Sequence, residues 1–475
     1  MPRFYITTSI VYTNASPHIG FALELVQADA IARWRNMQGD DVYFVTGTDE
    51  HGTKIMRSAE AAGVPASEFV DRIAGQVGQL AERLNISNTD FVRTSDRVRH
   101  WPAAQKIWQK LAENGDLYKK SYEGAYCVGH EAFIKPSELV DGLCPLHKTK
   151  PEIIREENWF FKLSRYIPQI RKLIETDRLR IVPTSRKSEL LNLLDDAEDV
   201  SFSRPSGQLP WGIPVPGDDT QTMYVWADAL SNYISALGYG TDEKNMAFWP
   251  ADVHLVGKDI TRFHAIIWPA MLLSAGLEVP KAIYVHGFIT VDGQKMSKSL
   301  GNVVDPFEIL GAWPTDVVRY FMLRELQSTE DGDFSMKNLA NRYTSDLANG
   351  LGNLVQRTTT LVNALPQGTA DSPGDAPELQ KVLDDEAYHE AFKQFRLHDA
   401  VAAVWEKIGI ANAYLNSTEP WKKGEAERAG ILGIVKAMVH HIAQLLEPVM
   451  PSTAEAITAR LEANNVGEPM FPRRS

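Results

Sequence analysis

Cysteine and long apolar runs are both scarce in this sequence. Its 475 residues include only two cysteines, Cys127 and Cys144. That is too few for a disulfide-stapled secreted domain and indicates a reducing compartment. No apolar run reaches the roughly 18 residues that a membrane span needs, and the N-terminal residues Met1–Ile6 lack a signal-peptide pattern. We therefore expect a cytoplasmic protein with no membrane partner.

A net positive charge and repeated segments are also missing. The formal charge of −12 has the wrong sign for a protein that coats nucleic acid, although a local basic face stays compatible with it. Any nucleic-acid partner should therefore be bound by limited, shape-guided contacts, and DNA is not expected. There is no Gly-x-Gly-x-x-Gly fingerprint, which argues against a dinucleotide enzyme, and no repeat at solenoid spacing. The length predicts about two to four domains.

Expected strands alternate with expected helices over most of the first 290 residues. Residues 4–12, 41–46, 221–229, 254–259 and 282–285 have the β-branched and aromatic composition of buried strands. Helical spacing of apolar residues begins at Ile19. This alternation predicts an α/β fold: a doubly wound, parallel, Rossmann-like sheet interrupted by an inserted domain. From residue 338 onward, helical patterns such as 387–415, 428–446 and 452–463 predict an α-helical bundle.

A basic loop, called the lysine loop below, follows the last of the expected strands, 282–285. Within five residues it contains Lys295, Ser297, Lys298 and Ser299, and glycines close to both ends allow sharp reversals. Such a loop can bring two charges and several donors onto a polyphosphate. A solvated surface turn would be the ordinary interpretation of this pentamer alone. The other motifs of the chain favour phosphate binding.

His18 lies between the first expected strand and the helix that follows it. The N-terminus of a helix favours an anion, and an imidazole there can donate a hydrogen bond to a phosphate oxygen. Gly20 removes a side chain where a nucleotide would lie against the backbone. The alternative is an ordinary helix cap.

Other candidate ligand-binding residues follow expected strands. The segment 47–52 comes after the second strand, where open α/β sheets place ligands, and its Asp49 could pair with an ammonium group. An ordinary turn fits this segment too. An aromatic pocket could form from side chains of several segments, although core packing is the commoner role for each: Ile10, Tyr12, Trp226, Tyr233, Ile260 and His264.

Two Cys-x-x-His pairs lie in the inserted segment. Cys127 precedes His130, and Cys144 precedes His147. Their number and spacing fit a tetrahedral zinc knuckle. They fit equally well two small core cysteines accompanied by surface histidines.

The helical C-terminal region carries side chains suited to unstacked RNA bases. Asn353 and Arg357 lie four residues apart on one helical face, and Trp421 follows Pro420 at an expected helix–loop junction. Aromatic stacking and arginine contacts hold single-stranded RNA bases. The alternative is a buried indole and a solvated guanidinium.

Together these motifs resemble the class I aminoacyl-tRNA synthetases, and within them the methionine branch. Residues 295–299 are identical to the family's second signature, Lys-Met-Ser-Lys-Ser. Residues 14–21 are similar to the first, which contains His-Ile-Gly-His, but Phe21 replaces its second histidine, the position to which an ATP contact is credited in the family. The likeness to the methionine branch rests on residues 47–52, 224–229 and 257–260. The resemblance runs nearly end to end.

The resemblance implies an activity and its site residues. The chain would activate L-methionine with ATP and Mg²⁺, release pyrophosphate, and transfer the methionyl group to the 3′ end of tRNA(Met), including initiator tRNA. Catalytic roles would go to His18, Lys295 and Lys298. ATP would contact His18, Gly20, Asp259, Lys295, Ser297 and Lys298. Methionine would contact Ile10, Tyr12, Asp49, Trp226, Ala229, Tyr233, Ile260 and His264. The anticodon would be read by Asn353, Arg357 and Trp421, and Zn²⁺ would bind Cys127, His130, Cys144 and His147.

The resemblance also implies a division of the chain. Residues 1–117 and 218–290 would form the two halves of the catalytic domain, and residues 118–217 a connective-peptide insertion. Residues 291–345 would carry the lysine loop and a segment that contacts the tRNA stem, and residues 346–475 would bind the anticodon. Two alternatives stay open: another class I synthetase or nucleotidyltransferase, and a non-catalytic tRNA-binding paralogue.

Overall fold

The structure, a computed structural model, divides into two compact units. It describes residues 1–475 except 129–131, 135–137, 146, 292, 297–301, 367, 371–373, 375, 464 and 475, and except the side chains of 122, 123, 132, 133 and 295. Unit 1 consists of Met1–Pro17, Gly39–Glu82 and Ser87–His286. Unit 2 consists of His18–Gln38, Arg83–Ile86 and Gly287–Ser475.

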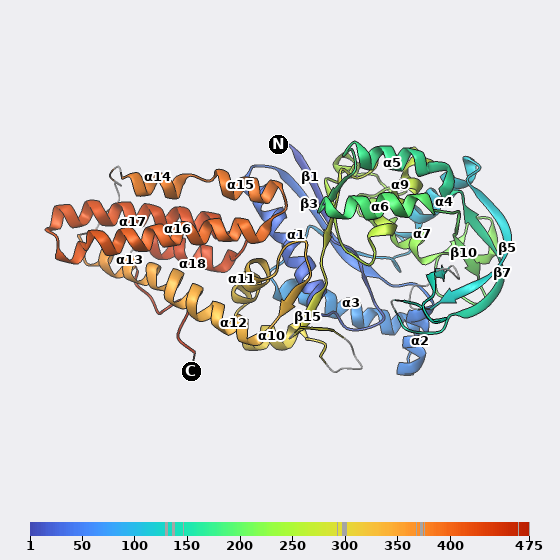
Figure 1. The fold of residues 1–475 in the computed structure, drawn as a ribbon, viewed down its shortest axis with the longest axis horizontal. Helices are drawn as coiled ribbons and strands as arrows, with labels where there is room; N and C mark the ends of the chain where they lie inside the picture. Colours follow the sequence, from blue (N-terminus) through green and yellow to red (C-terminus); the bar gives the residue numbers. More distant parts are fainter. Residues whose placement is uncertain are drawn as a thin grey trace. The chain divides into compact units, whose positions relative to one another are not determined.

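A seven-stranded sheet organises unit 1, and all of its pairings are parallel (Figure 1). The strand order is β2–β3–β1–β13–β14–β8, with β4 paired to β3. The bounds are β1 Arg3–Thr7, β2 Val11–Tyr12, β3 Asp41–Asp49, β4 Asp90–Arg93, β8 Arg180–Val182, β13 Val253–Gly257 and β14 Ala282–His286. The predicted parallel α/β fold is confirmed.

The middle strands of this sheet are apolar because both of its faces are covered. Every residue of β13 and β14 is buried, as parallel sheets require. The chain leaves β1 toward β3 on one side, whereas β13 leads to β14 on the other. Strands β1 and β13 therefore flank the point where the winding reverses, and open α/β sheets bind ligands at the carboxyl ends of such strands.

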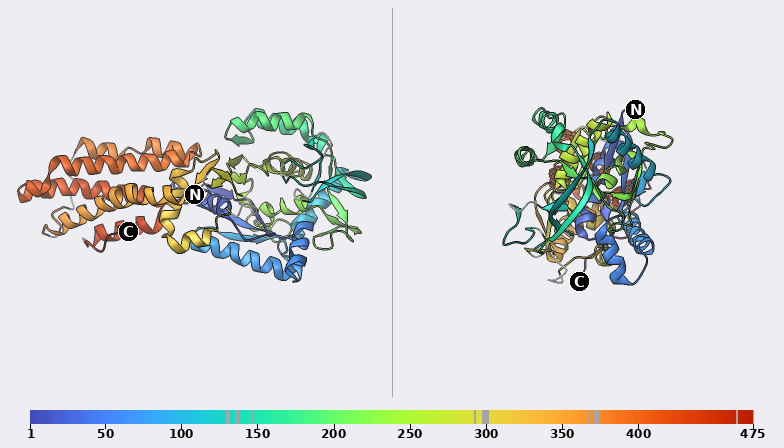
Figure 2. Two further views of the ribbon diagram at one scale, coloured as in Figure 1. Left: turned by 60° about the horizontal axis from the view of Figure 1, so that its bottom comes forward. Right: turned by 90° about the vertical axis from the view of Figure 1, so that its right-hand side faces the viewer.

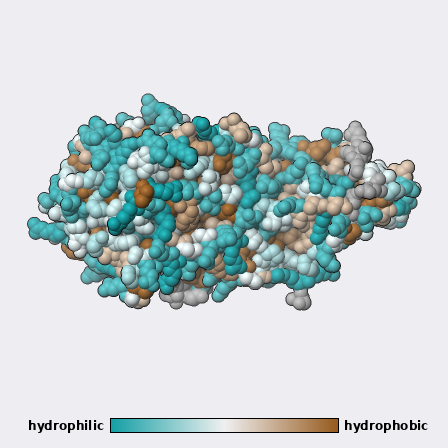
Figure 3. Space-filling model, turned by 180° about the vertical axis from the view of Figure 1, so that it is seen from behind, coloured by the Kyte–Doolittle hydropathy of each residue, from teal (hydrophilic) through white to brown (hydrophobic). Residues whose placement is uncertain are grey.

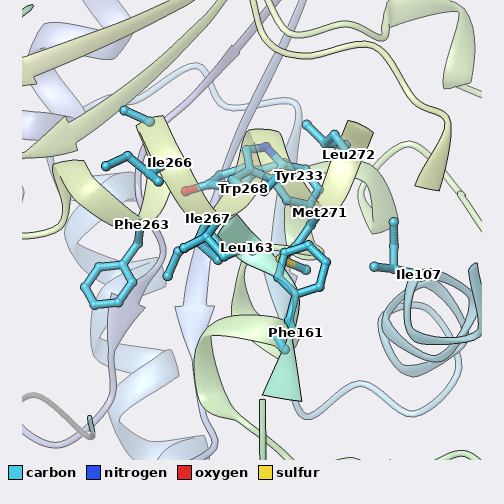
Figure 4. Packing of buried hydrophobic residues seen from close by; sticks show 14 of the residues in the cluster. Ile107, Phe161, Leu163, Tyr233, Phe263, Ile266, Ile267, Trp268, Met271 and Leu272 are labelled. Atoms are coloured by element: carbon cyan, nitrogen blue, oxygen red, sulfur yellow. The ribbon is translucent and has the colours of Figure 1, made fainter. Parts of the chain in front are cut away.

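Helices and a shared apolar core support the sheet. Unit 1 contains α2 Thr53–Ala62, α3 Ala66–Arg83, α4 Trp101–Glu113, α5 Ile167–Glu175, α6 Ser185–Asp195, α8 Asn232–Ser235 and α9 Trp268–Ala275. Figure 4 shows Phe161 of strand β7 (Glu152–Phe161) close to Met271 of α9, with Ile107 of α4 on the side of these two. Trp268 and Met271 of this cluster are fully buried.

Two small antiparallel sheets lie between β4 and β13 in the chain. One has the order β6–β5–β7–β9, and the other has the order β10–β12–β11. Their bounds are β5 Leu117–Cys127, β6 Ala132–Ile134, β9 Val200–Ser201, β10 Ser203–Pro205, β11 Pro214–Val215 and β12 Asp218–Met223. Strand β8, which lies within the expected insertion 118–217, pairs with β14 in the large sheet.

One predicted strand is wrong. Residues 221–229 were expected to form a buried strand, but β12 ends at Met223 and helix α7, Val225–Ala229, follows. Tyr224 keeps extended backbone angles, φ −62° and ψ 138°, as the N-cap of that helix.

Unit 2 consists mostly of helices, which confirms the predicted helical C-terminal region (Figures 1 and 2). Its helices are α1 Ile19–Met37, α10 Pro306–Ala312, α11 Thr315–Glu325, α12 Met336–Arg342, α13 Asn353–Asn363, α14 Pro377–Leu383, α15 Glu386–Lys393, α16 Leu397–Thr418, α17 Glu425–Leu446 and α18 Pro451–Glu462. The long helices α16 and α17 run side by side. Residues 387–415 are not one helix as predicted, because Phe395 adopts φ +56° between α15 and α16.

Helix α17 has a membrane-like composition but belongs to a bundle. By length and hydropathy it could cross a membrane, yet 56% of its most apolar window is buried inside the protein. The buried side chains include Val435, Met438 and Ile442. The face of the molecule shown in Figure 3 is mainly hydrophilic, with hydrophobic residues in small separate areas.

A small sheet of unit 2 carries the start of the lysine loop. Strand β15, Ile289–Val291, pairs antiparallel with β16, Gln294–Lys295, and parallel with β17, Gly332–Phe334. A strand and a tight turn thus form the entrance of the loop, with Gly293 at φ +76°.

Candidate active site

The carboxyl end of β1 is irregular at the position where a ligand is expected. Thr7 lies opposite Val45 of β3, and Val11 of β2 lies opposite Thr48. The four residue steps from Thr7 to Val11 thus lie opposite only three steps on β3, from Val45 to Thr48. This leaves one extra residue, as in a β-bulge. Bulges re-aim side chains and occur beside active sites. Ile10 lies within this irregular stretch.

Tyr12 and Asp49 are brought together by the same register. They are directly opposite each other where β2 and β3 end. The Asp49 carbonyl accepts hydrogen bonds from the Thr13 amide and from Thr13 Oγ1, both at 3.0 Å, which fixes the backbone there. The Asp49 side chain is largely buried. A carboxylate held at the end of a strand in this way can pair with a ligand's ammonium group.

Three of the predicted pocket residues form one aromatic cluster. The Trp226 ring, on α7, stacks on Phe263 with centroids 3.7 Å apart and meets the His264 ring edge-on. The Tyr233 hydroxyl, on α8, lies 2.7 Å from His264 Nε2. Tyr12, Trp226 and Ile260 all pack against the apolar core that contains Tyr233. Ala229 is buried on α7, one turn after Trp226.

His264 is held as a neutral imidazole. Its Nδ1 lies 3.0 Å from the Ile260 carbonyl, which can only accept, so Nδ1 carries the hydrogen and Nε2 accepts from the Tyr233 hydroxyl. Burial lowers the pKa of His264 to about 4. It lies in a π-helical stretch, Phe263–Ile267, a distortion that is frequent at functional sites. The cluster thus presents aromatic surface without charge.

A second neutral histidine, His254, packs against the Tyr233 ring. The Tyr233 ring lies 4.2 Å from the His254 ring of β13, centroid to centroid. Trp268 Nε1 donates to His254 Nε2 at 3.3 Å, which leaves His254 Nδ1 to donate to Thr7 Oγ1 at 2.7 Å. Burial, together with the nearby His264, lowers the pKa of His254 well below its ordinary value. These contacts fix the wall of the aromatic cluster.

A buried polar cluster that sequence reasoning missed connects the segment after β3 to α7. Asp228 accepts from His51 Nδ1 at 2.6 Å and from His100 Nε2 at 2.7 Å. Burial opposes ionisation, but attraction to His51 and hydrogen bonds from both imidazoles leave the pKa of Asp228 lowered. His51 and Asp228 lie inside two motifs that carried the family resemblance, and this was the available signal. Nothing local marks His100, which is 128 residues away from Asp228.

The predicted phosphate-binding residues lie mainly in unit 2. His18 is the N-cap of α1, and its Nδ1 accepts from the Gly20 amide at 3.1 Å, which leaves the ring hydrogen on Nε2. A Cβ at Gly20 would lie 2.9 Å from the imidazole. Phe21 is buried and offers no hydrogen bond. Asp259, in unit 1, is exposed just after β13. Ser297, Lys298 and the Lys295 side chain lie outside what the structure describes.

Three predicted metal ligands converge. The Sγ atoms of Cys127 and Cys144 lie 3.7 Å and 3.5 Å from His147 Nδ1, and the three ligand atoms are all within 4.8 Å of one another. Both cysteines are buried. The fourth candidate, His130, lies outside the described residues.

The predicted RNA-reading residues gather at one place in the helical bundle. Asn353 is exposed at the first turn of α13, and Arg357 follows one turn later. The Arg357 guanidinium lies 5.5 Å from the Trp421 ring centroid and donates to Asn416 Oδ1 at 2.9 Å. Trp421 is 43% exposed, so much of its ring is available for stacking.

Comparison with known proteins decides the family. The profile of the family described as "tRNA synthetases class I (M)" matches residues 4–148 and 134–359. The chain belongs to this family. The synthetase is 42% identical to the methionine–tRNA ligase of Thermotoga maritima, over 97% of its own length and 75% of that protein. It is 42% identical to that of Brucella suis, over 96% and 91%.

A solved structure gives the same assignment. The Mycobacterium tuberculosis methionyl-tRNA synthetase in complex with methionyl-adenylate matches the synthetase with a TM-score of 0.92 at 37% identity, over 100% of this chain and 99% of that one. The predicted fold class and the predicted membership in the methionine branch are therefore confirmed.

The neutral His264 predicts a loss of stability in mild acid. An exposed histidine in the unfolded chain has a pKa near 6.5, whereas burial lowers the folded-state pKa of His264 to about 4. As the pH falls from 6.5 toward 4, the unfolded chain takes up a proton that the folded protein does not. The synthetase should lose about 1.4 kcal/mol of folding free energy per pH unit in this window through His264.

Unfolding of the synthetase and of His264→Gln at pH 7.5 and pH 5.5 measures this effect. The loss on acidification should be smaller in the variant, which keeps a hydrogen-bonding side chain but cannot titrate. Other titrating groups, including His254, are present in both proteins. Equal losses in the two would show that His264 is not held neutral.

Proposed function

We propose that the synthetase is a methionine–tRNA ligase. It activates L-methionine with ATP to methionyl-adenylate and pyrophosphate, and then transfers the methionyl group to the 3′ end of tRNA(Met). The observation that supports this most directly is the uncharged aromatic cluster of Trp226, Tyr233 and His264 beside the carboxyl ends of the central strands. The test is ATP–pyrophosphate exchange with a panel of amino acids: methionine alone should support rapid exchange.

The side chain of methionine suits this cluster. A thioether is apolar and polarizable and makes favourable contacts with aromatic rings. A charged His264 would prefer water to sulfur, so its lowered pKa matters for recognition. Ile10, Tyr12, Ala229 and Ile260 would complete the pocket. The Asp49 carboxylate would pair with the α-ammonium group, which every amino acid shares, so specificity rests on the aromatic residues.

The ATP-binding groups would act by position and charge. His18 would donate from Nε2 to a phosphate oxygen, and Gly20 leaves the room that its imidazole needs. Asp259 would take part in ATP binding, and Lys295, Ser297 and Lys298 would bind the phosphates as pyrophosphate leaves. Displacement at phosphorus requires alignment and charge stabilisation, with no covalent intermediate on the protein. Mg²⁺ would accompany ATP and offset the charge of its phosphates.

Zn²⁺ fits the cluster of Cys127, Cys144 and His147. Two thiolates and an imidazole are a typical zinc donor set, and their ligand atoms already converge within 4.8 Å. His130 would be the fourth ligand. A closed four-ligand site is structural, so zinc would hold the strands of the inserted segment together and take no part in the reaction.

The helical residues 346–475 would bind the anticodon, with residues 118–217 as the connective peptide and 291–345 contacting the tRNA stem. Residues 1–117 and 218–290 would carry the catalytic sheet. Asn353 and Arg357 would hydrogen-bond to anticodon bases, and Trp421 would stack on one of them. The enzyme would charge both elongator and initiator tRNA in the cytoplasm.

Trp421→Ala should weaken aminoacylation without changing adenylate formation. Stacking of a base on an aromatic side chain contributes about 1–3 kcal/mol, so kcat/KM for tRNA should fall about tenfold to a hundredfold. Methionine-dependent ATP–pyrophosphate exchange needs no tRNA and should stay at the wild-type rate. The matched control is Leu383→Ala, which truncates another exposed apolar side chain of the helical region. A parallel fall in exchange would make Trp421 a structural residue.

A further inference from the structure

The strand that leads into the lysine loop is supported by few backbone pairings of its own. The described part of β16 consists of Gln294 and Lys295 and pairs only with β15, through Thr290↔Lys295 and Val291↔Gln294. A two-stranded hairpin is marginal in water. On its other side, β15 pairs with β17, which places Asp333 beside Thr290. Strand β17 is therefore the main support of the loop's entrance.

One carboxylate oxygen of β17 holds both sides of the hairpin turn. Asp333 Oδ1 accepts a hydrogen bond from Thr290 Oγ1 at 2.7 Å and another from the Gly293 amide at 2.7 Å. Thr290 is the cross-strand partner of Lys295, and Gly293 is the turn residue with φ +76°. Hydrogen bonds to an ionised acceptor are about twice as strong as neutral ones. The carboxylate thus fixes the direction in which the chain enters the loop.

Packing and hydrogen bonds of the neighbouring residues hold the backbone on both sides of Asp333. The next residue, Phe334, is buried and meets Phe321 of α11 edge-to-face at 5.5 Å. Just upstream, Asp331 Oδ1 accepts from the Phe288 amide at 2.7 Å. A Cβ at Gly287 would lie 2.0 Å from the Glu330 carbonyl oxygen, so the backbone at Gly287 packs directly against the backbone at Glu330. Asp333 is nevertheless exposed, so its carboxylate is not needed to complete the core.

We propose that Asp333 is a positioning residue for adenylate formation. It would hold the Thr290–Lys295 hairpin in the conformation from which the lysine loop reaches the phosphates of ATP. The proposal rests on the proposed function of that loop. In this proposal Asp333 acts through the hairpin that it holds, so its loss should affect the rate of the chemical step and leave methionine binding unchanged.

Asp333→Ala, Asp333→Asn and Thr290→Val test the proposal. A misplaced catalytic group can cost about a hundredfold, so kcat for methionine-dependent ATP–pyrophosphate exchange should fall about tenfold to a hundredfold in Asp333→Ala. Asparagine keeps an acceptor oxygen and should retain more activity than alanine. KM for methionine and the unfolding temperature should match the wild type in all three. Glu308→Gln, which removes another exposed carboxylate of the same unit, is the matched control.

Combining Asp333→Ala with Thr290→Val separates positioning from general damage. If Asp333 acts through Thr290, the double variant should be little slower than Asp333→Ala alone. Wild-type kcat in Asp333→Ala, or effects of the two changes that multiply, would overturn the proposal. So would a rise in KM for methionine equal to the fall in kcat. Failure of the proposed function itself looks different, because the wild type would then show no methionine-dependent exchange.

Discussion

Replacing Lys298 by alanine is expected to slow methionine-dependent ATP–pyrophosphate exchange by about two to three orders of magnitude. Removing one donor that stabilises developing charge typically costs about 3–4 kcal/mol of transition-state stabilisation. The charge on the leaving pyrophosphate develops in the transition state, so kcat should carry most of the loss. KM for methionine should change little, because the proposed methionine pocket lies in unit 1 and does not include this loop.

The matched control is Lys337→Ala. Lys337 is an exposed lysine on α12 of the same unit and should be dispensable for exchange. The two variants lose the same charge, so any difference between them reflects position rather than net charge. Equal exchange rates for Lys298→Ala and the wild type would remove Lys298 from the catalytic residues. A large rise in KM for methionine would instead place it in the amino-acid site.

The sheet was predictable because its strands are apolar on both faces, whereas some local conformations were not. The run from Met223 to Ala229 has the residues of a strand, but α7 begins at Val225. Asp228 in that run is buried and hydrogen-bonded to two imidazoles, and such contacts come from tertiary structure. The break at Phe395 is similar. No glycine or proline marks it, and burial of Phe392 and Leu397 on either side accompanies the left-handed residue between them.

The candidate site was predictable where a motif is local. Asp49 lies at the end of a strand, and His18 precedes a helix, so both positions could be predicted from the order of elements. The contacts that hold the site could not be read in this way. Asp333 and Thr290 are 43 residues apart, and their contact depends on a parallel pairing. The strand β8, which pairs with β14 across about a hundred residues of chain, gave no local signal either.

Replacing Arg319 by methionine is expected to destabilise unit 2 by about 3–5 kcal/mol, the usual cost of removing one partner from a buried ion pair. Arg319 is fully buried on α11, and its Nη2 lies 2.7 Å from Asp29 Oδ2 of α1. The same guanidinium donates at 3.0 Å to three backbone carbonyls, those of Leu84, Pro448 and Val449. Methionine fills much of the volume but donates nothing, so the three carbonyls lose a donor and Asp29 loses one of its two arginine partners, Arg33 being the other. Denaturant unfolding followed by circular dichroism measures the effect.

The matched control is Arg342→Met. Arg342 pairs with Glu325 at 2.8 Å and with Asp346 at 3.0 Å, but its side chain is 33% exposed. A partly solvated pair of this kind contributes about 1 kcal/mol or less. If both variants lost the same stability, burial of the Asp29–Arg319 pair would not be what matters.

Replacing both Arg319 and Asp29 tests whether the loss of stability comes from leaving the buried Asp29 carboxylate without Arg319. In Arg319→Met combined with Asp29→Leu, no carboxylate is left without Arg319, and apolar replacements of a buried pair are often neutral. The double variant should therefore be more stable than Arg319→Met alone, although the three carbonyls stay without the guanidinium. A double variant less stable than either single one would mean that Asp29 contributes mainly through its other partner, Arg33, at 2.8 Å. Helix α1 would then depend on a contact within itself more than on its contact with α11.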